Sequence, residues 1–84
     1  MNTYMTGQNG LENNKFKIKS YGVAELGLMY NPSLQPASAQ KALNRWIAYN
    51  EALTEALHNT GWRKGQRKFT PLQTTQIVRF LGEP

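Results

Sequence analysis

The sequence contains no cysteine, no aspartate and only one histidine, His58. Without thiols the chain can form neither a disulfide bond nor a thiolate metal site, and a single imidazole is too little for a zinc site of the usual kind. Nothing near His58 in the sequence suggests the orienting partner that a general base requires. Glu51 and Glu55, four residues apart on one predicted helix, are typical of a solvated helix face. We therefore predict a protein that is not an enzyme and that uses no metal or cofactor.

Long apolar runs are also missing. No stretch approaches the roughly 20 residues that cross a bilayer. Residues 1–14 lack the basic start and the apolar core of a secretory signal. These absences lead us to expect a cytoplasmic protein that does not contact a membrane.

Acidic side chains are scarce relative to basic ones. Ten Lys and Arg residues stand against five glutamates, so the formal net charge is +5 at pH 7. An excess of this size favours an anionic partner: a nucleic acid, an acidic protein or a membrane surface. Of these we expect one of the first two.

The length of 84 residues suits one small domain. Residues 1–14 are rich in Asn, Gly, Gln and Thr and poor in apolar side chains, which predicts a disordered N-terminal tail. We expect residues 15–84 to form a single compact domain. In Lys15–Ser20, lysines alternate with Phe16 and Ile18, and this period of two indicates a half-buried strand.

Apolar periodicity and end signals predict four short helices, near residues 22–30, 36–49, 51–60 and 71–81. In the first helix, the missing side chain of Gly27 would allow a second helix to cross closely. The last helix has the clearest start, because Thr70 is a good N-cap, Pro71 suits the first helical position and Gln73 completes a capping box. The fold class is therefore mainly α, a small α+β domain with a minimal sheet. Its expected core consists of Leu26, Leu43, Trp46, Ile47, Leu53, Leu57, Phe69, Ile77 and Val78.

The most basic stretch is GWRKGQRKFTPLQ, Gly61–Gln73, which holds four of the ten Lys and Arg within six positions. Trp62–Arg63 and Arg67–Phe69 are predicted to be the two short strands of a hairpin. Residues 64–66 would form its loop, in which Gly65 supplies the positive φ. The aromatic side chains at either end would bury the base of this hairpin and leave its charges exposed.

The predicted order of elements is strand, helix, turn, helix, helix, hairpin, helix, which is the outline of a winged helix-turn-helix. In that outline the second helix enters the major groove of DNA and the hairpin, or wing, lies along the phosphates. The exposed face of the second helix carries no acid: Arg45 suits guanine edges, and Asn44 or Gln40 suits adenine edges. The hypothesis assigns eight residues to a nucleic-acid site: Gln40, Lys41, Asn44, Arg45, Arg63, Lys64, Arg67 and Lys68. Lys41 and the four cations of the wing would contact phosphates.

The stretch GWRKGQRKFTPLQ resembles the wing of MerR-type and excisionase-type DNA-binding domains. In those domains a glycine-aromatic-arginine turn leads through an aromatic residue into the next helix. The resemblance implies a winged helix-turn-helix and DNA binding. The sequence differs from that pattern in a longer turn with two prolines after the first helix, and in an additional predicted helix, residues 50–60, before the wing.

A second resemblance covers nearly everything after residue 18. It rests on the segments KSYGVAELGLMYNPSLQP, ALNRWI, TGWRKGQRKFTPLQ and LGEP. These segments are similar to a family of short bacterial proteins, largely from Bacteroides, that is described as a domain of unknown function. The resemblance implies a small, stand-alone, intracellular protein, and it assigns no activity and no functional residue.

Two functional hypotheses follow from these observations. The preferred one is a small nucleic-acid-binding accessory protein, with DNA as the expected partner and RNA as the second nucleic acid considered. The alternative is a protein-interaction module whose same basic surface docks an acidic protein.

Overall fold

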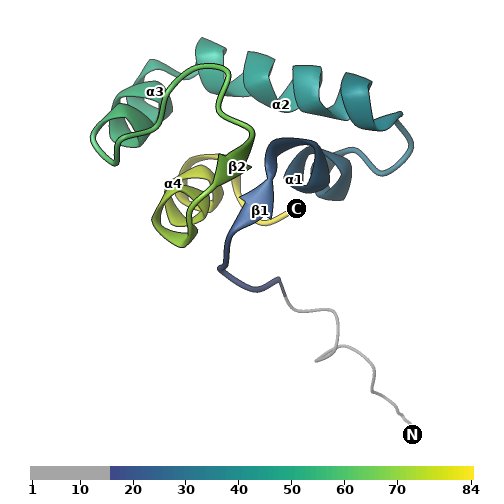
Figure 1. Ribbon diagram of the computed structural model, residues 1–84, viewed down its shortest axis with the longest axis horizontal. Coiled ribbons are helices and arrows are strands. Elements are labelled where there is room, and N and C mark those ends of the chain that lie inside the picture. The colour runs from purple at the N-terminus through teal and green to yellow at the C-terminus, as the bar shows by residue number, and fades with distance from the viewer. Residues whose placement is uncertain (1–15) are drawn as a thin grey trace, which may run out of the picture.

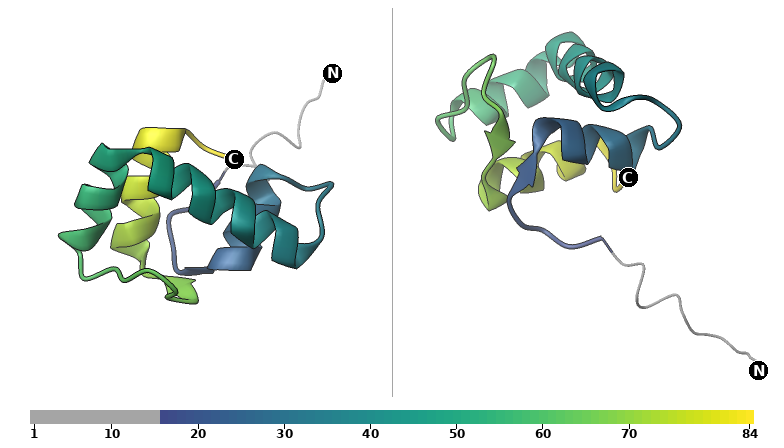
Figure 2. Two further views of the ribbon diagram at one scale, coloured as in Figure 1. Left: turned by 90° about the horizontal axis from the view of Figure 1, so that it is seen from above. Right: turned by 45° about the vertical axis from the view of Figure 1, so that its right-hand side comes forward.

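The computed structural model of the protein describes residues 16–84, which form four helices and two short strands. In chain order these are β1 (Tyr21–Gly22), α1 (Val23–Tyr30), α2 (Pro36–Tyr49), α3 (Glu51–His58), β2 (Lys68–Phe69) and α4 (Pro71–Leu81). The mainly α, small α+β class is confirmed. Figures 1 and 2 show α2 on one side of the molecule and α4 on the opposite side. The predicted division into a tail, 1–14, and a domain, 15–84, stays a prediction, because residues 1–15 lie outside the described residues.

The ends of the helices follow the local signals of the sequence. At the start of α4, Thr70 Oγ1 accepts a hydrogen bond from the Gln73 backbone N–H at 3.2 Å, and Gln73 Oε1 accepts one from the Thr70 N–H at 3.0 Å. The predicted capping box is therefore confirmed. Gly82, with φ of 86°, follows the last residue of this helix. Asn50 caps α3 in the same way, since its Oδ1 accepts from the Leu53 N–H at 3.0 Å.

The core is close to the predicted one. Seven of the nine expected side chains are at most 1% exposed: Leu26, Leu43, Ile47, Leu53, Leu57, Phe69 and Ile77. Val78 is only partly buried. Trp46 was expected in the core, and that prediction is wrong because 37% of its surface is exposed. The buried stripe of α2 consists of Ala39, Leu43 and Ile47, so Trp46 lies on the flank of the helix. Its ring packs edge-on against the ring of Tyr30, with the two ring centroids 5.8 Å apart.

The close approach expected at Gly27 is present. A Cβ atom added to Gly27 would lie 2.5 Å from the backbone oxygen of Ala39, which belongs to α2. No side chain fits in that space, so glycine is what allows α1 and α2 to cross at this distance.

The sheet differs from the expected one. β2 pairs with β1 in an antiparallel register that places Tyr21 opposite Phe69. Trp62–Arg63 forms no strand, so the predicted hairpin is wrong. The strand predicted at Lys15–Ser20 is also wrong over its described part, because residues 16–20 are irregular and the strand begins only at Tyr21. Tyr21, which is 4% exposed, and not Ile18, which is 48% exposed, enters the core.

The irregular segment before β1 is fastened to the C-terminal half of the chain by side chains. Ser20 Oγ donates to the backbone oxygen of Phe69 at 2.7 Å, and Thr74 Oγ1 donates to that of Lys19 at 2.8 Å. These two hydroxyls donate hydrogen bonds to backbone carbonyl oxygens that would otherwise need partners in a longer β-ladder. The sheet can therefore remain only two residues long on each side.

Candidate nucleic-acid interface

The basic turn, Arg63–Lys68, folds as a tight backbone turn. The Gln66 N–H donates to the Arg63 oxygen at 3.0 Å, which closes a four-residue β-turn with Lys64 and Gly65 at its centre. Gly65 has φ of 89°, as the sequence predicted. A positive φ at this third position is typical of a type II turn and is adopted readily only by glycine or asparagine.

One side chain, Gln66, holds this turn together. Its Oε1 accepts from the Arg63 N–H at 3.2 Å, and its Nε2 donates both to the Lys68 backbone oxygen and to Gln73 Oε1, the latter at 2.7 Å. Gln73 is only 2% exposed and belongs to the capping box of α4. The basic turn is thus linked by hydrogen bonds to the start of α4. Nothing in the sequence pattern identified Gln66, because this role depends on a bond between two glutamines seven residues apart in the chain.

Both ends of the basic turn are anchored. Before the turn, Trp62 is 8% exposed, and its backbone N–H donates to the Leu57 oxygen at 3.1 Å. After the turn, the Arg67 oxygen accepts from the Val23 N–H at 2.9 Å, and Phe69 is fully buried. Aromatic burial on each side of the turn is therefore confirmed, although a hairpin is not what positions it. The four cations predicted for this site are all exposed: Arg63, Lys64, Arg67 and Lys68.

The basic turn lies beside α2, and residues of both line two hollows. Lys64 and Gly65 line one groove together with Asn44, and Gly65 and Arg67 line a second hollow together with Gln40. Figure 1 shows the chain crossing from α3 past α2 to β2 at this place. The structure therefore brings two of the predicted amides of α2 together with two of the predicted cations of the turn.

The other predicted residues flank these hollows without lining them. Lys41 and Arg45 are exposed on α2 and lie one turn apart, on the side of the helix away from the buried Leu43. Arg63 and Lys68 are exposed at the two ends of the basic turn. All eight predicted residues thus lie on α2 or the basic turn, and all are at least partly exposed.

One further exposed cation, Lys19, lies outside the predicted site. Lys19 precedes Ser20, whose hydroxyl binds the backbone of Phe69, and its own backbone oxygen accepts from Thr74 Oγ1, so Lys19 lies beside the start of α4. Its ammonium group lies 5.2 Å from the centre of the Tyr21 ring, which is within the range of a cation–π contact. Residues 49 positions apart in sequence carry this pairing of segments, so local patterns could not reveal it.

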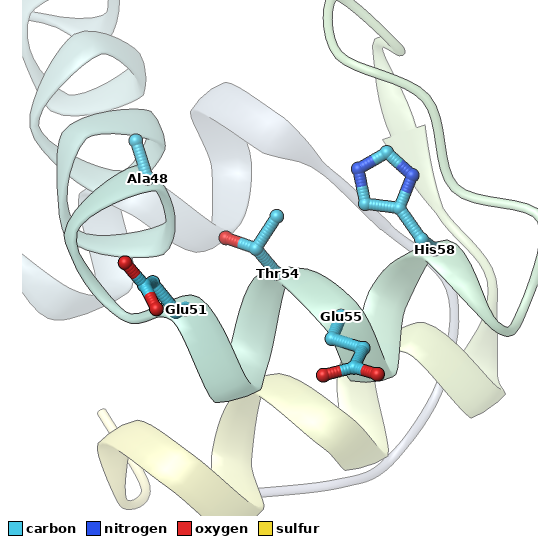
Figure 3. A pocket seen from close by; sticks show the side chains of 5 residues that line it. All are labelled: Ala48, Glu51, Thr54, Glu55 and His58. Carbon is cyan, nitrogen blue, oxygen red and sulfur yellow. The ribbon is translucent and has the colours of Figure 1, made fainter.

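A groove beside the basic turn is one of the concave features of this surface. It has a volume of about 380 Å³ and is lined by Asn44, Ala48, Thr54, His58, Trp62, Lys64 and Gly65. An adjoining hollow of about 370 Å³ shares Ala48, Thr54 and His58 with it and extends to Glu51 and Glu55. Figure 3 shows Thr54 and His58 on α3 facing this space, with Ala48 of α2 at its side. None of the lining residues except Asn44 and Lys64 was predicted to form part of a site.

These features define a small α+β domain in which a basic turn lies beside the second of four helices. Residues 17–84 match the family model described as Domain of unknown function (DUF4248). The chain belongs to this family, which confirms the resemblance to a domain of unknown function. Neither the curated proteins nor the solved structures contain a significant match to the chain.

Two further features of the described part of the chain bear on its chemistry. Within residues 16–84, no helix combines the length and the apolar character needed to cross a membrane. Over the same residues, no three side chains of His, Cys, Asp or Glu are grouped so that they could hold a metal ion.

Proposed function

We propose that this protein is a small, non-catalytic, cytoplasmic nucleic-acid-binding protein, and that its partner is DNA. The observation that carries the proposal is the position of the basic turn, whose exposed cations lie beside the amides of α2. Cations supply sequence-independent attraction to phosphates, and amides on an adjacent helix supply hydrogen bonds to base edges.

The order of the turn in the free protein supports this function. Because Gln66 and the two buried aromatic side chains already hold the basic turn, its backbone does not have to be ordered on binding. Fixing a residue costs about 1–2 kcal/mol, so a preformed turn retains more of the phosphate attraction as affinity.

The proposal includes a winged helix-turn-helix of the MerR or excisionase type. In it, α1 and α2 are the helix pair that crosses at Gly27, α2 is the recognition helix, and the basic turn acts as the wing. The helix α3 is then an insertion between the recognition helix and the wing. The pairing of β1 with β2 supports this arrangement, because it ties the strand before α1 to the last residue of the basic turn and to Phe69.

The roles of individual residues differ within this proposal. Arg45 and Asn44 would contact base edges, with Gln40 as a further amide, whereas the cations of the basic turn would contact phosphates. Lys41 lies one helical turn before Arg45 on the outward side of α2 and would contact the backbone of the duplex.

The test is the salt dependence of DNA binding. Replacing Arg63, Lys64, Arg67 and Lys68 by glutamine should weaken binding and flatten the slope of log K against log salt by about 0.9 for each phosphate that the protein no longer neutralises. The free energy of unfolding should change little, since exposed substitutions are usually within about 0.5 kcal/mol. Fluorescence anisotropy with a labelled duplex measures the affinity, and urea unfolding measures the stability.

A matched pair of single variants separates the effect of where a cation lies from the effect of the protein's net charge. Arg63→Gln and Arg79→Gln each remove one exposed arginine, but Arg79 lies on α4, on the opposite side of the molecule from α2. We expect Arg63→Gln alone to flatten the salt slope. Equal effects of the two variants would mean that only net charge matters. A wild-type protein that binds neither DNA nor RNA at about 50 mM salt would overturn the proposal, and an acidic protein would then be the better partner for the same surface.

A further inference from the structure

We propose that the groove between α2, α3 and the basic turn accepts one unpaired nucleobase. This inference rests on the proposed nucleic-acid binding and names the kind of nucleic acid that the site prefers, one with a base displaced from its stack. The groove lies on the same surface as the basic turn, and its volume of about 380 Å³ is within the range of small-molecule sites.

The interior of the groove suits a flat ring. Ala48 adds only a methyl group to the wall, which leaves room beside α2. Thr54 Oγ1 donates to the Ile47 oxygen at 2.6 Å, so the hydroxyl is occupied, and Figure 3 shows its methyl group on the side toward His58. The His58 ring is exposed and stands edge-on to Trp62, with ring centroids 5.3 Å apart at 89°. An exposed imidazole is one of the aromatic surfaces on which proteins stack unpaired bases.

The polar groups at the rim fit a nucleotide better than they fit an apolar ligand. Asn44 has an amide that can both donate to and accept from the edge of a base. Lys64 lies at the end of the groove next to the basic turn, where it would meet the phosphate attached to that base. The carboxylates Glu51 and Glu55 border only the adjoining hollow, and Figure 3 shows that Glu55 points away from His58. The end of the groove next to the basic turn is thus positive, because Lys64 lies there. The carboxylates of the adjoining hollow would repel a phosphate backbone that continued in that direction.

This charge pattern predicts how the strand runs. The backbone stays on the basic turn, one base enters the groove, and the remaining bases stay outside it. An intact duplex offers no such base, because each base is paired and stacked. A duplex with a single-nucleotide bulge supplies one without changing the phosphates on either side.

The experiment compares three duplexes that have the same flanking sequence. The first has a bulged thymidine, the second a bulged abasic residue, and the third no bulge. The first two carry the same number of phosphates, so any difference between them comes from the base. We expect the bulged thymidine to bind at least about fivefold more tightly than the abasic bulge, a factor that corresponds to about 1 kcal/mol, the lower end for stacking one base on an aromatic side chain.

Two variants locate the effect in the groove. Ala48→Leu fills the space and should reduce the preference for the base to less than about twofold, as should His58→Ala, which removes the stacking surface. Ala52→Leu is the matched control, since Ala52 is exposed on α3 and does not line the groove. Circular dichroism of each variant checks that the fold is intact.

The outcomes distinguish the two proposals. Equal affinity for the two bulged duplexes, together with binding of the intact duplex, would refute the groove and leave the proposed function standing. A preference for the base that survives both Ala48→Leu and His58→Ala would also refute the groove. Binding of none of the three duplexes at about 50 mM salt would refute the proposed function and the groove with it.

Discussion

Gln66→Ala is the sharpest single perturbation of the interface, because it disturbs the basic turn without removing a charge. The side chain makes three hydrogen bonds, to the Arg63 N–H, the Lys68 oxygen and Gln73 Oε1. Each contributes a net of about 0.5–1.5 kcal/mol to stability in a typical protein. Gln66 is partly exposed, so water replaces it at the two backbone groups, and Gln73 keeps its bond to the Thr70 N–H. We therefore expect a loss of about 1–2 kcal/mol rather than the full sum.

Urea unfolding followed by tryptophan fluorescence measures this loss. The midpoint should fall while the dependence on urea stays the same, since the surface exposed on unfolding is unchanged. Gln66→Glu tests the donor role separately, because a carboxylate can still accept from the Arg63 N–H but cannot donate to Gln73. Gln76→Ala is the matched control: it is also a partly buried glutamine, it lies on α4, and it takes no part in this network. We expect that control to be within about 0.5 kcal/mol of the wild type.

The same variant predicts a particular effect on DNA binding. A turn without the Gln66 side chain must be ordered on binding, at about 1–2 kcal/mol for one residue, so affinity should fall about tenfold. The slope of log K against log salt should stay unchanged, because every cation that is proposed to contact a phosphate is still present. A Gln66→Ala protein with wild-type stability and wild-type affinity would show that the network does not hold the turn.

Three further predictions concern the packing of the helices. Gly27→Ala should destabilise the protein by about 1–3 kcal/mol or more, because the new methyl group would clash with Ala39 of α2. Gly22→Ala is the control in the same urea assay, because the nearest atom to a Cβ added at Gly22 would be Glu25 Cβ, at 3.7 Å. Burial, and to a smaller extent the nearby Glu83, raises the pKa of Tyr30 to about 12 from an ordinary value of 10.0, so its contribution to stability is fully present below pH 10 and is lost as the pH rises toward 12. Stability measured between these pH values should fall less in Tyr30→Phe than in the wild type, and an equal fall would contradict this assignment. Trp46→Ala should cost about 1–2 kcal/mol, below the 3–5 of a fully buried aromatic, because its ring is partly exposed; a loss of folding would show that Trp46 matters more than its exposure indicates.

The features that the sequence predicted correctly depend on neighbouring residues. The capping box of α4 requires only Thr70 and Gln73, three positions apart, and the positive φ of Gly65 depends on a single residue. The helix bounds follow from prolines and caps of the same kind. The close crossing at Gly27 could be predicted from the sequence for a similar reason, since a glycine inside an apolar stripe indicates a close approach of another element.

The features that the sequence analysis missed depend on contacts between distant segments. Alternation in Lys15–Ser20 suggested a strand there, but pairing is fixed by Tyr21 opposite Phe69, and these two residues are far apart in the chain. The basic stretch suggested a hairpin because glycine, aromatic and basic residues occur in the right order. Trp62 is instead held by α3 and by the core, so it has no strand to pair with. The groove has walls from α2, α3 and the basic turn, and no local pattern could have assembled them.

The position of the interface is therefore set by residues that lie outside it. The Arg67 oxygen is bound by the N–H of Val23 at the start of α1, so the end of the basic turn is fixed relative to α1. The helix α1 in turn crosses α2 at Gly27, where no side chain separates the two backbones. A widening of that crossing would shift α2, with Asn44, relative to the Arg67 end of the basic turn, which is attached to α1. Gly27 should thus affect the proposed DNA affinity as well as stability, although it is buried and lies outside the proposed site. The geometry of the proposed site is therefore a property of the whole helical packing, and we expect the position of the four cations relative to Asn44 to depend on the tight crossing at Gly27.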